Sequence, residues 1–362
     1  MTDGAATRHS PVAERSGPPG LRALPRWVVL AALAVLLVAA ALASAAIGAA
    51  GIPPGRLVTA LGLGDATSPD VARDRLILLS IRLPRIVLAV TVGALLATAG
   101  TIMQGLFRNP LADPGLVGVS AGAGLAAAAT IVLGDRLLGG FGPEALPLAA
   151  FAGALGVTAM LYRIATREGR TSIATLLLAG LALGALAGAG TGLLVFLADD
   201  RQLRDITFWT LGSMAGATWP KVWAMLPFLA AVLVSLPMIA RGLDMLVLGE
   251  AEAFHMGVPV ESLKRFAIVL MAAAVGAAVA ASGVIGFVGI VVPHLLRLVI
   301  GPAHRTLLPA GVLFGGLVLL VADTIARTLA SPAELPVGIV TALIGAPFFL
   351  VLLLRQRAVV GL

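Results

Sequence analysis

The chain has 362 residues, of which 59% are hydrophobic and only 12% are charged, and its mean hydropathy is +1.03. A soluble domain is about 45–50% apolar and about a quarter charged, so the composition excludes that class and indicates an integral membrane protein. The net charge of +7 does not indicate a nucleic-acid partner, because the basic residues are scattered between apolar segments and form no stripe. The absence of cysteine excludes disulfides and thiolate metal sites.

Residues 1–26 are polar, rich in Pro and Gly, and basic, so we expect a disordered cytoplasmic N-terminus. The apolar run Trp27–Ala50 follows. A cleaved signal peptide is the competing interpretation, but the apolar part of a signal peptide is usually only about 7–15 residues long. Since about 20 apolar residues cross a bilayer, we predict the first membrane span here.

Further apolar segments continue to the end of the chain and predict one all-α membrane domain, residues 27–362, with about ten spans. The later spans are approximately Ile86–Leu106, Leu116–Leu133, Leu146–Ile164, Ile173–Leu197, Val222–Ala240, Phe266–Ile285, Val288–Ile300, Leu307–Ile325 and Val337–Leu354. The segment from Val288 is short and contains Pro293, which makes its limits the least defined.

The distribution of basic residues predicts the orientation, because Lys and Arg favour cytoplasmic loops. With an inside N-terminus, the inner loops carry more bases, whereas the outer loops also carry acids such as Asp65, Asp199 and Asp205. The inner bases are Arg108, Arg163, Arg167, Arg170, Arg241, Lys264, Arg265, Arg305, Arg355 and Arg357. We therefore expect both termini in the cytoplasm.

Two segments of the chain are similar to each other. Val92–Gly100 reads VGALLATAG and Val275–Gly283 reads VGAAVAASG, with five of nine positions identical. In the expected topology the two copies cross in opposite directions, which predicts an inverted repeat relating spans 2–5 to spans 7–10. Chance similarity between Ala/Gly-rich helices is the alternative.

The fifth span contains a glycine at every fourth position: Gly180, Gly184, Gly188 and Gly192. Without Cβ atoms they allow another helix or a substrate to approach the backbone closely. Tight helix packing and the lining of a transport pathway are both compatible with this pattern.

The charged segment Arg241–Arg265 lies between two spans on the expected cytoplasmic side and suggests a docking surface for a soluble partner. The chain has only two lysines, Lys221 and Lys264, and neither follows the glycine pattern of a phosphate-binding loop. If the protein uses ATP, we expect another subunit to hydrolyse it, and we expect this chain not to be an enzyme.

Several unusual strings occur in order along the chain. Between spans 2 and 3 the sequence is FRNPLADPGL, at Phe107–Leu116, where two prolines and a glycine break the helix. The others are IRLPR at Ile81–Arg85, LAG at Leu178–Gly180, GFVG at Gly286–Gly289, VPHLLR at Val292–Arg297, HRTLLP at His304–Pro309, ADTIAR at Ala322–Arg327 and ELPVG at Glu334–Gly338.

Together these strings resemble the FecCD-type permeases, the membrane subunits of ABC importers for vitamin B12, ferric siderophores and haem. The resemblance covers all but about the first 26 residues. It implies a type II ABC importer permease fold of ten helices. It also implies a homodimer with the pathway at its interface, two cytoplasmic ABC ATPase subunits, a periplasmic binding protein and a location in the bacterial inner membrane.

The resemblance also implies roles for residues at the periplasmic ends of the spans. Arg82, Arg85 and Arg327 match positions that dock acidic residues of the binding protein. Guanidinium groups pair bidentately with carboxylates, which suits this role, although Arg at the end of a span also anchors helices at the membrane interface. Asp323 precedes Arg327 by four residues, so we expect a helical ion pair between them.

On the cytoplasmic side, residues 241–265 match the paired coupling helices that enter a groove of the ATPase, and a solvated loop is the alternative. The turns of this segment, and so the coupling residues, are Gly249, Glu250, Gly257, Val258 and Pro259. Positions of the cytoplasmic gate match Asn109, Leu111, Ser172 and Thr175. The match is weaker at the last two, because RTSIATLLLAG from Arg170 departs from the family pattern.

The segment from Ala198 to Trp219 is more similar to the haem-importer branch than to the B12 branch. Arg201 and Arg204 can attract haem propionates or pair with Asp199, Asp200 and Asp205. We therefore expect a haem permease that works by alternating access, with ferric-siderophore or cobalamin import as alternatives. We expect no permanently bound cofactor, no metal site, and ATP acting only on the partner subunit.

Three other interpretations fit less well. Gly118–Gly122 satisfies G-x-S-x-G, with His294 as an imaginable base, but a serine hydrolase needs a strand-to-helix turn at this motif. Haem ligation has no strong candidate in the outer half of the route, because His9, His255 and His304 fall on the cytoplasmic side. His294 matches a position shared across the family that the sequence resembles, so it cannot specify haem. An ion-coupled secondary transporter needs ionisable residues near the membrane midplane, where the spans contain almost none.

Overall fold

The computed structural model describes residues 25–48, 52–60, 69–138, 145–331 and 333–360. The predicted disordered N-terminus, residues 1–26, lies outside the described residues except for its last two positions. Every predicted span has a helical counterpart. These helices are α1 (Arg26–Ala46), α4 (Leu83–Leu106), α5 (Val119–Leu138), α6 (Ala145–Ala165), α7 (Ile173–Leu197), α9 (Trp219–Leu246), α11 (Val260–Ser282), α12 (Val288–Ile300), α13 (His304–Leu329) and α14 (Val337–Val360).

Shorter elements connect these helices at the two ends of the bundle. They are α2 (Pro54–Ala60), α3 (Pro69–Ile77), the π-helical turn η2 (Leu78–Arg82), the 3-10 turn η3 (Pro114–Val117), the hairpin strands β1 (Thr166–Arg167) and β2 (Arg170–Thr171), α8 (Asp200–Thr210) and α10 (Glu250–His255). In the hairpin, Thr166 pairs with Thr171 in antiparallel register.

Two predicted boundaries differ from the structure for local reasons. The third span begins at Val119, not Leu116, because Pro114–Val117 forms the separate turn η3, which ends at Gly118 in a left-handed conformation with φ +78°. Within Arg241–Arg265, the first residues continue α9 and the last belong to α11, so α10 is the one separate helix of this fully described segment. α12 has 13 residues and rises only about 20 Å, less than the roughly 30 Å of a bilayer core.

Helix α4 forms the centre of the bundle, and 21 of its 24 residues are buried. It packs against α9, α11, α12 and α13. Close approach depends on glycine: a Cβ atom on Gly93 would lie 2.3 Å from the Gly315 carbonyl oxygen, and one on Gly100 would lie 2.0 Å from that of Gly289. In contrast, α1 lies at the outside and exposes Trp27 and Val35, as expected of a lipid-facing helix.

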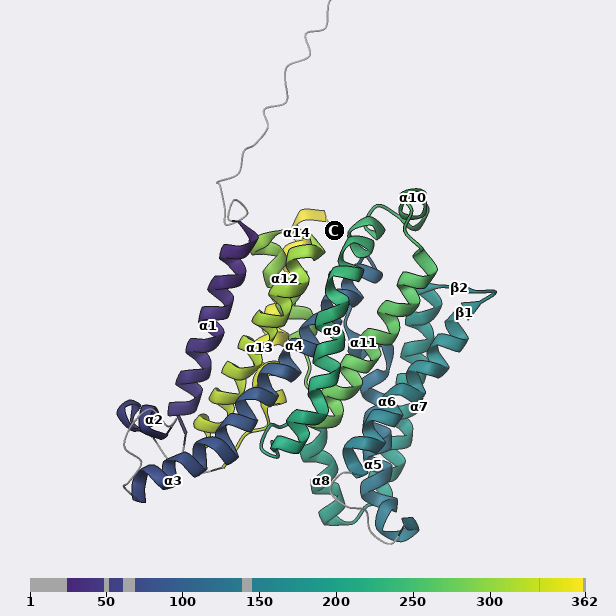
Figure 1. The fold of residues 1–362 in the computed structure, drawn as a ribbon. Coiled ribbons are helices and arrows are strands. Elements are labelled where there is room, and N and C mark those ends of the chain that lie inside the picture. The colour runs from purple at the N-terminus through teal and green to yellow at the C-terminus, as the bar shows by residue number, and fades with distance from the viewer. Residues whose placement is uncertain (1–24, 49–51, 61–68, 139–144, 332, 361–362) are drawn as a thin grey trace, which may run out of the picture.

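The packing of α4 and α11 follows the predicted inverted repeat. The two helices lie side by side and run in opposite directions (Figure 1). α4, from the second span, packs through Gly93 onto α13, from the ninth; α11, from the seventh span, packs through Gly276 onto Ala154 of α6, from the fourth. The fold is therefore the predicted all-α bundle with related halves.

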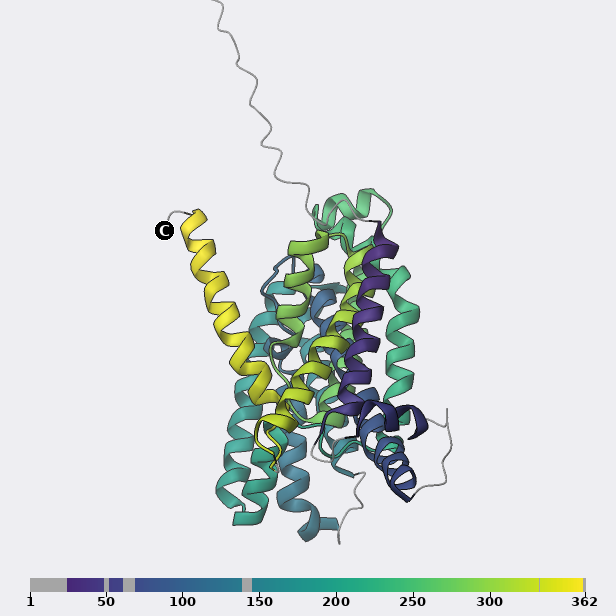
Figure 2. The same cartoon turned by 90° about the vertical axis from the view of Figure 1, so that its left-hand side faces the viewer.

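The two ends of the bundle differ in the elements they carry. The start of α1, the end of α14, α10 and the β1–β2 hairpin lie at one end, and α2, α3 and α8 lie at the other (Figure 1). We refer to these as the α10 end and the α8 end. α14 leans away from the bundle towards the α10 end (Figure 2).

Candidate functional site

At the α8 end, Arg85 is held between two carboxylates. Its Nη2 lies 2.9 Å from Asp323 Oδ1, and its Nη1 lies 2.8 Å from Glu334 Oε2. Asp323 is only 1% exposed, whereas the Glu334 side chain is 43% exposed. The prediction of an Asp323–Arg327 ion pair is wrong. Asp323, on α13, pairs instead with Arg85, on α4, because the guanidinium group of Arg85 donates to both carboxylate oxygens.

The other two predicted docking arginines hold the end of α1. Arg82 donates to the carbonyl oxygens of Ala45 and Ala46, and Arg327 donates to the carbonyl and hydroxyl oxygens of Ser44. The last carbonyls of a helix have no partner within it, so cations stabilise this end. Arg82, Arg85 and Arg327 are all buried in the single chain. Their docking to a partner stays a prediction, and it would require these side chains to exchange internal acceptors for external ones.

At the α10 end, the predicted coupling residues form the two turns that bracket α10. Gly249 adopts φ +128° before Glu250 opens the helix, and Gly257 adopts φ +82° after it. Val258 donates its backbone N–H to Ala253 at 3.0 Å, and Pro259 precedes α11.

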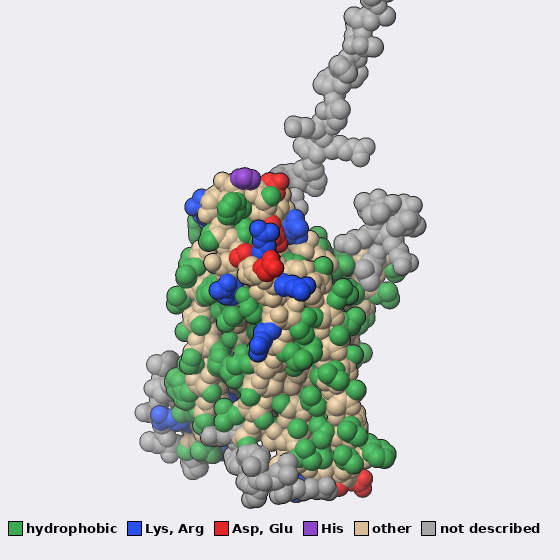
Figure 3. Space-filling model, turned by 90° about the vertical axis from the view of Figure 1, so that its right-hand side faces the viewer, with side chains coloured by type: hydrophobic (Ala, Val, Ile, Leu, Met, Phe, Trp, Pro, Cys, Tyr) green, Lys and Arg blue, Asp and Glu red, His purple; other side chains and the backbone are tan. Residues whose placement is uncertain are grey.

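The tip formed by α10 and its flanking turns exposes large apolar side chains beside charged ones. Val247, Leu248, Phe254 and Met256 are between 42% and 67% exposed. Basic and acidic side chains gather near this end, above a largely apolar belt (Figure 3). Exposed apolar residues within a polar rim are typical of a protein-binding surface.

The predicted gate residues make local contacts at the α10 end. Asn109 Oδ1 accepts from the Leu111 N–H at 2.9 Å and so satisfies a backbone group next to the end of α4. Ser172 caps α7: its Oγ accepts from the Thr175 N–H at 3.2 Å and from the Thr175 hydroxyl at 2.9 Å. These contacts explain the local structure, and the gating role stays a prediction.

Asp113 opens η3 next to the predicted gate. Its Oδ1 accepts from the Gly115 N–H at 2.7 Å. Burial raises the pKa of the Asp113 carboxyl above its ordinary value, and the hydrogen bond from Gly115 opposes this rise.

The glycine ladder of α7 divides into two parts. Gly180 and Gly184 lie against Gly118: a Cβ atom on Gly118 would lie 3.0 Å from the Gly180 carbonyl oxygen. Cβ atoms on Gly188 or Gly192 would meet nothing within 4 Å. Tight packing within the chain therefore accounts for the first two glycines, and the pathway prediction concerns the open face of the other two.

Helix α8 presents the predicted haem-attracting arginines to the outside. Asp199 caps α8 through the Gln202 N–H, and the Gln202 side chain returns the contact. Arg201 and Arg204 are exposed, and neither forms a salt bridge within the described part of the chain. The alternative in which they pair with Asp199, Asp200 and Asp205 does not occur there.

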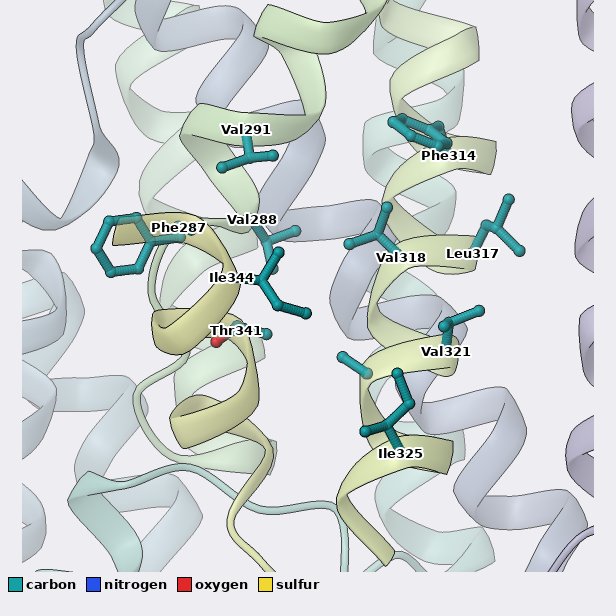
Figure 4. A pocket seen from close by; sticks show the side chains of 12 residues that line it. Phe287, Val288, Val291, Phe314, Leu317, Val318, Val321, Ile325, Thr341 and Ile344 are labelled. Carbon is teal, nitrogen blue, oxygen red and sulfur yellow. The ribbon is translucent and has the colours of Figure 1, made fainter. Parts of the chain in front are cut away.

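An apolar hollow of about 310 Å³ lies between α12, α13 and α14 (Figure 4). Val288, Val318 and Ile344 point into it, and Thr341 contributes the one hydroxyl group among its lining side chains. A second hollow, of about 590 Å³, lies beside the end of α8 and is lined by Thr210 and Leu211, by residues between α11 and α12, and by α14 from Gly338 to Pro347. The described residues contain no cluster of His, Asp and Glu able to hold a metal ion.

Sequence reasoning missed three buried or partly buried polar contacts that join segments distant in the sequence. His304 Nδ1 lies 2.8 Å from Asp244 Oδ1, and Arg297 donates to the Gln104 side-chain oxygen. The third contact is centred on Lys264, which is 2% exposed. The rarity of lysine in the chain was the available signal for this residue.

The imagined serine-hydrolase motif opens helix α5 and follows a 3-10 turn, so the strand-to-helix turn it requires is absent from this described segment.

Related helical halves and a charged, partly apolar tip at one end are features of a polytopic membrane protein. The chain belongs to the FecCD transport family, whose model matches residues 36–355. It is thus a permease of the ABC-importer type, as the sequence motifs predicted.

Relatives match over most of the chain. It is 45% identical to the hemin transport system permease protein HmuU of Yersinia pestis, over 93% of this chain and 98% of the relative. It is 49% identical to the cobalamin import system permease protein BtuC of Halobacterium salinarum, over 77% and 73%. It is 42% identical to the vitamin B12 import system permease protein BtuC of Klebsiella pneumoniae, over 92% and 94%.

Solved structures agree on the fold. An inward-facing metal-chelate type ABC transporter matches with a TM-score of 0.79 and 34% identity, covering 91% of this chain and 99% of the other. PsaBC from Streptococcus pneumoniae matches with a TM-score of 0.52 and 16% identity over 77% and 93%, which supports the fold alone.

Proposed function

We propose that this chain is the permease of an ATP-driven importer that moves haem from a periplasmic binding protein into the cytoplasm by alternating access. The observation that carries the substrate is the match to a hemin permease over 93% of this chain and 98% of the relative. Arg201 and Arg204 support it, because both are exposed at the α8 end and have no internal carboxylate partner within the described residues. Guanidinium groups bind carboxylates such as propionates bidentately.

The surfaces at the two ends of the molecule support two proposed partners, an ATPase and a binding protein. An ABC ATPase would bind the apolar and charged α10 tip, and a periplasmic binding protein would approach the arginine-rich α8 end. A second copy of the chain would complete the pathway, and two ATPase subunits would hydrolyse the ATP. The assembly would lie in the bacterial inner membrane with both termini in the cytoplasm. No permanently bound cofactor and no nucleic acid is required.

Import of cobalamin or a ferric siderophore by the same machinery is the alternative, and the cobalamin permeases among the relatives favour testing it. An ion-coupled secondary transporter has less support. Asp323, which is buried within a span, is paired with Arg85 and lies six residues before the end of α13.

The test is uptake into proteoliposomes that contain this chain, its ATPase and its binding protein, with haem, a ferric siderophore and cobalamin compared side by side. We expect ATP-dependent uptake of haem alone. An Arg201→Ala/Arg204→Ala double variant should lower haem uptake, with Arg75→Ala, an exposed arginine of α3, as the matched control. Uptake of another ligand would refute the substrate, and uptake without ATP would refute the ABC mechanism.

A further inference from the structure

Lys264 lies near the start of α11 and is 2% exposed, and three acceptors, from β2, α10 and α11 itself, surround its ammonium group. Nζ lies 2.9 Å from the Thr171 carbonyl oxygen, 3.0 Å from Glu250 Oε2 and 2.7 Å from Glu261 Oε1. An ammonium group has three N–H donors, so each donor has one acceptor. A buried charge is tolerated when it is paired and hydrogen-bonded in this way.

The same group of residues fixes the backbone of Thr171 from both sides. Glu261 Oε2 accepts from the Thr171 N–H at 3.0 Å, while Lys264 donates to the Thr171 carbonyl oxygen. Thr171 is the last residue of β2 and directly precedes Ser172, the cap of α7. The Lys264 network therefore joins the beginning of α7 to α11.

Glu250 extends this network to the α10 tip. It is the first residue of α10, and its side chain is 43% exposed at the surface where the ATPase is proposed to bind. Among the hydrogen bonds and ion pairs of the described residues, those of Lys264 connect α10 with the hairpin that leads into α7. A displacement of α10 would thus act directly on Lys264 and, through it, on Thr171.

The choice of lysine fits this geometry. The chain uses arginine almost everywhere, with only two lysines among its 25 basic residues. A lysine presents its three donors from a single nitrogen, whereas arginine spreads its donors over a planar fork. Three acceptors that converge on one point therefore favour lysine at this position.

We propose that Lys264 is a positioning residue that transmits movement of the α10 tip to the start of α7, and so couples the ATPase to the cytoplasmic gate. This role rests on the proposed ABC-importer function. It concerns residues of the permease alone, and it treats Glu250, Lys264, Glu261 and Thr171 as one mechanical connection.

The test compares substrate taken up per ATP hydrolysed in the reconstituted complex for Lys264→Met, Lys264→Arg and Lys221→Met. Methionine keeps the length of the side chain without its donors, and arginine keeps the charge without the convergent geometry. Lys221, the other lysine, lies in α9 and is the matched control. We expect uptake per ATP to fall at least tenfold in both Lys264 variants while ATP hydrolysis continues, and to be unchanged in Lys221→Met.

The outcomes separate this inference from the proposed function. Absence of ATP-dependent uptake in the parent complex refutes the proposed function itself. Normal uptake per ATP in Lys264→Met, with the parent active, refutes the positioning role alone. If Lys264→Met does not fold, Glu250→Ala replaces it, because that half-exposed side chain is not needed to fill the core. The same loss is then expected, and a normal ratio refutes the role.

Discussion

At Arg85, one guanidinium group forms ion pairs with two carboxylates of the α8 end, Asp323 and Glu334. Arg85→Ala would leave Asp323, which is 1% exposed, as an unpaired buried anion. Breaking a buried pair costs about 3–5 kcal/mol, so we expect a clearly lower thermal midpoint for the purified protein in detergent. Arg75→Ala should change stability by less than about 0.5 kcal/mol, because Arg75 is exposed. Equal midpoints for the two variants would contradict the structural role of Arg85.

Asp113 gives a prediction that depends on pH. Its carboxyl has a raised pKa in the folded protein, so ionisation of this group opposes folding as the pH rises above the ordinary pKa of aspartate. Asparagine caps turns equally well and does not ionise. Asp113→Asn should therefore raise the thermal midpoint at neutral pH, and the gain should disappear below about pH 4. A gain that is the same at both pH values would mean that charge is not its cause.

Among the helices, glycine contacts decide which faces can change. Gly100→Ala would place a Cβ atom 2.0 Å from the Gly289 carbonyl oxygen, a backbone clash at the centre of the bundle. We expect a loss of about 3 kcal/mol, the upper end of what overpacking usually costs.

Gly188→Ala is the matched control for this variant, because its Cβ atom meets nothing within 4 Å. Alanine favours a helix over glycine by about 1 kcal/mol, so its thermal midpoint should stay equal or rise. Similar losses at Gly100 and Gly188 would contradict the packing described for α4. If Gly188→Ala folds normally but loses uptake, the open face of α7 belongs to the pathway or to the contact with a second copy.

The apolar pattern was sufficient to predict the ten apolar helices, seven of them long enough to cross a membrane, because burial in lipid or protein requires apolar segments. It was not sufficient for the ends of the helices. There, Gly118 separates η3 from α5, and the polar residues of α8 form a helix through the capping pair Asp199 and Gln202. The Asp323–Arg327 pair was predicted wrongly because spacing along one helix does not reveal a competing arginine on another.

For the whole molecule, the orientation in the membrane can be tested with cysteine, because the chain contains none. The hairpin and α8 lie at opposite ends of the bundle (Figure 1). We expect a membrane-impermeant maleimide to label Arg204→Cys on right-side-out vesicles, and to label Arg170→Cys only after the membrane is opened. The parent chain gives the unlabelled control. The reverse pattern would refute the orientation inferred from the basic residues.

Motifs could predict candidate functional residues only one segment at a time. The α10 turns and the arginines of the α8 end were found because each stands out within its own segment. The contact of Lys264 with Thr171 and Glu250 was not, because it brings together residues 93 and 14 positions away. Such contacts depend on helix packing, which local sequence does not specify.

The pairing of Arg85 with Asp323 also has a consequence for biosynthesis. The two residues are 238 positions apart, so at roughly 5–20 residues per second Arg85 leaves the ribosome about 10–50 s before its partner exists. During this interval α4 has neither α13 nor the Asp323 carboxylate beside it. The newly made N-terminal helices therefore stay in the membrane during this interval with Arg85 unpaired near the membrane surface. A nascent chain that stops before Asp323 should be a preferred target of membrane quality-control proteases.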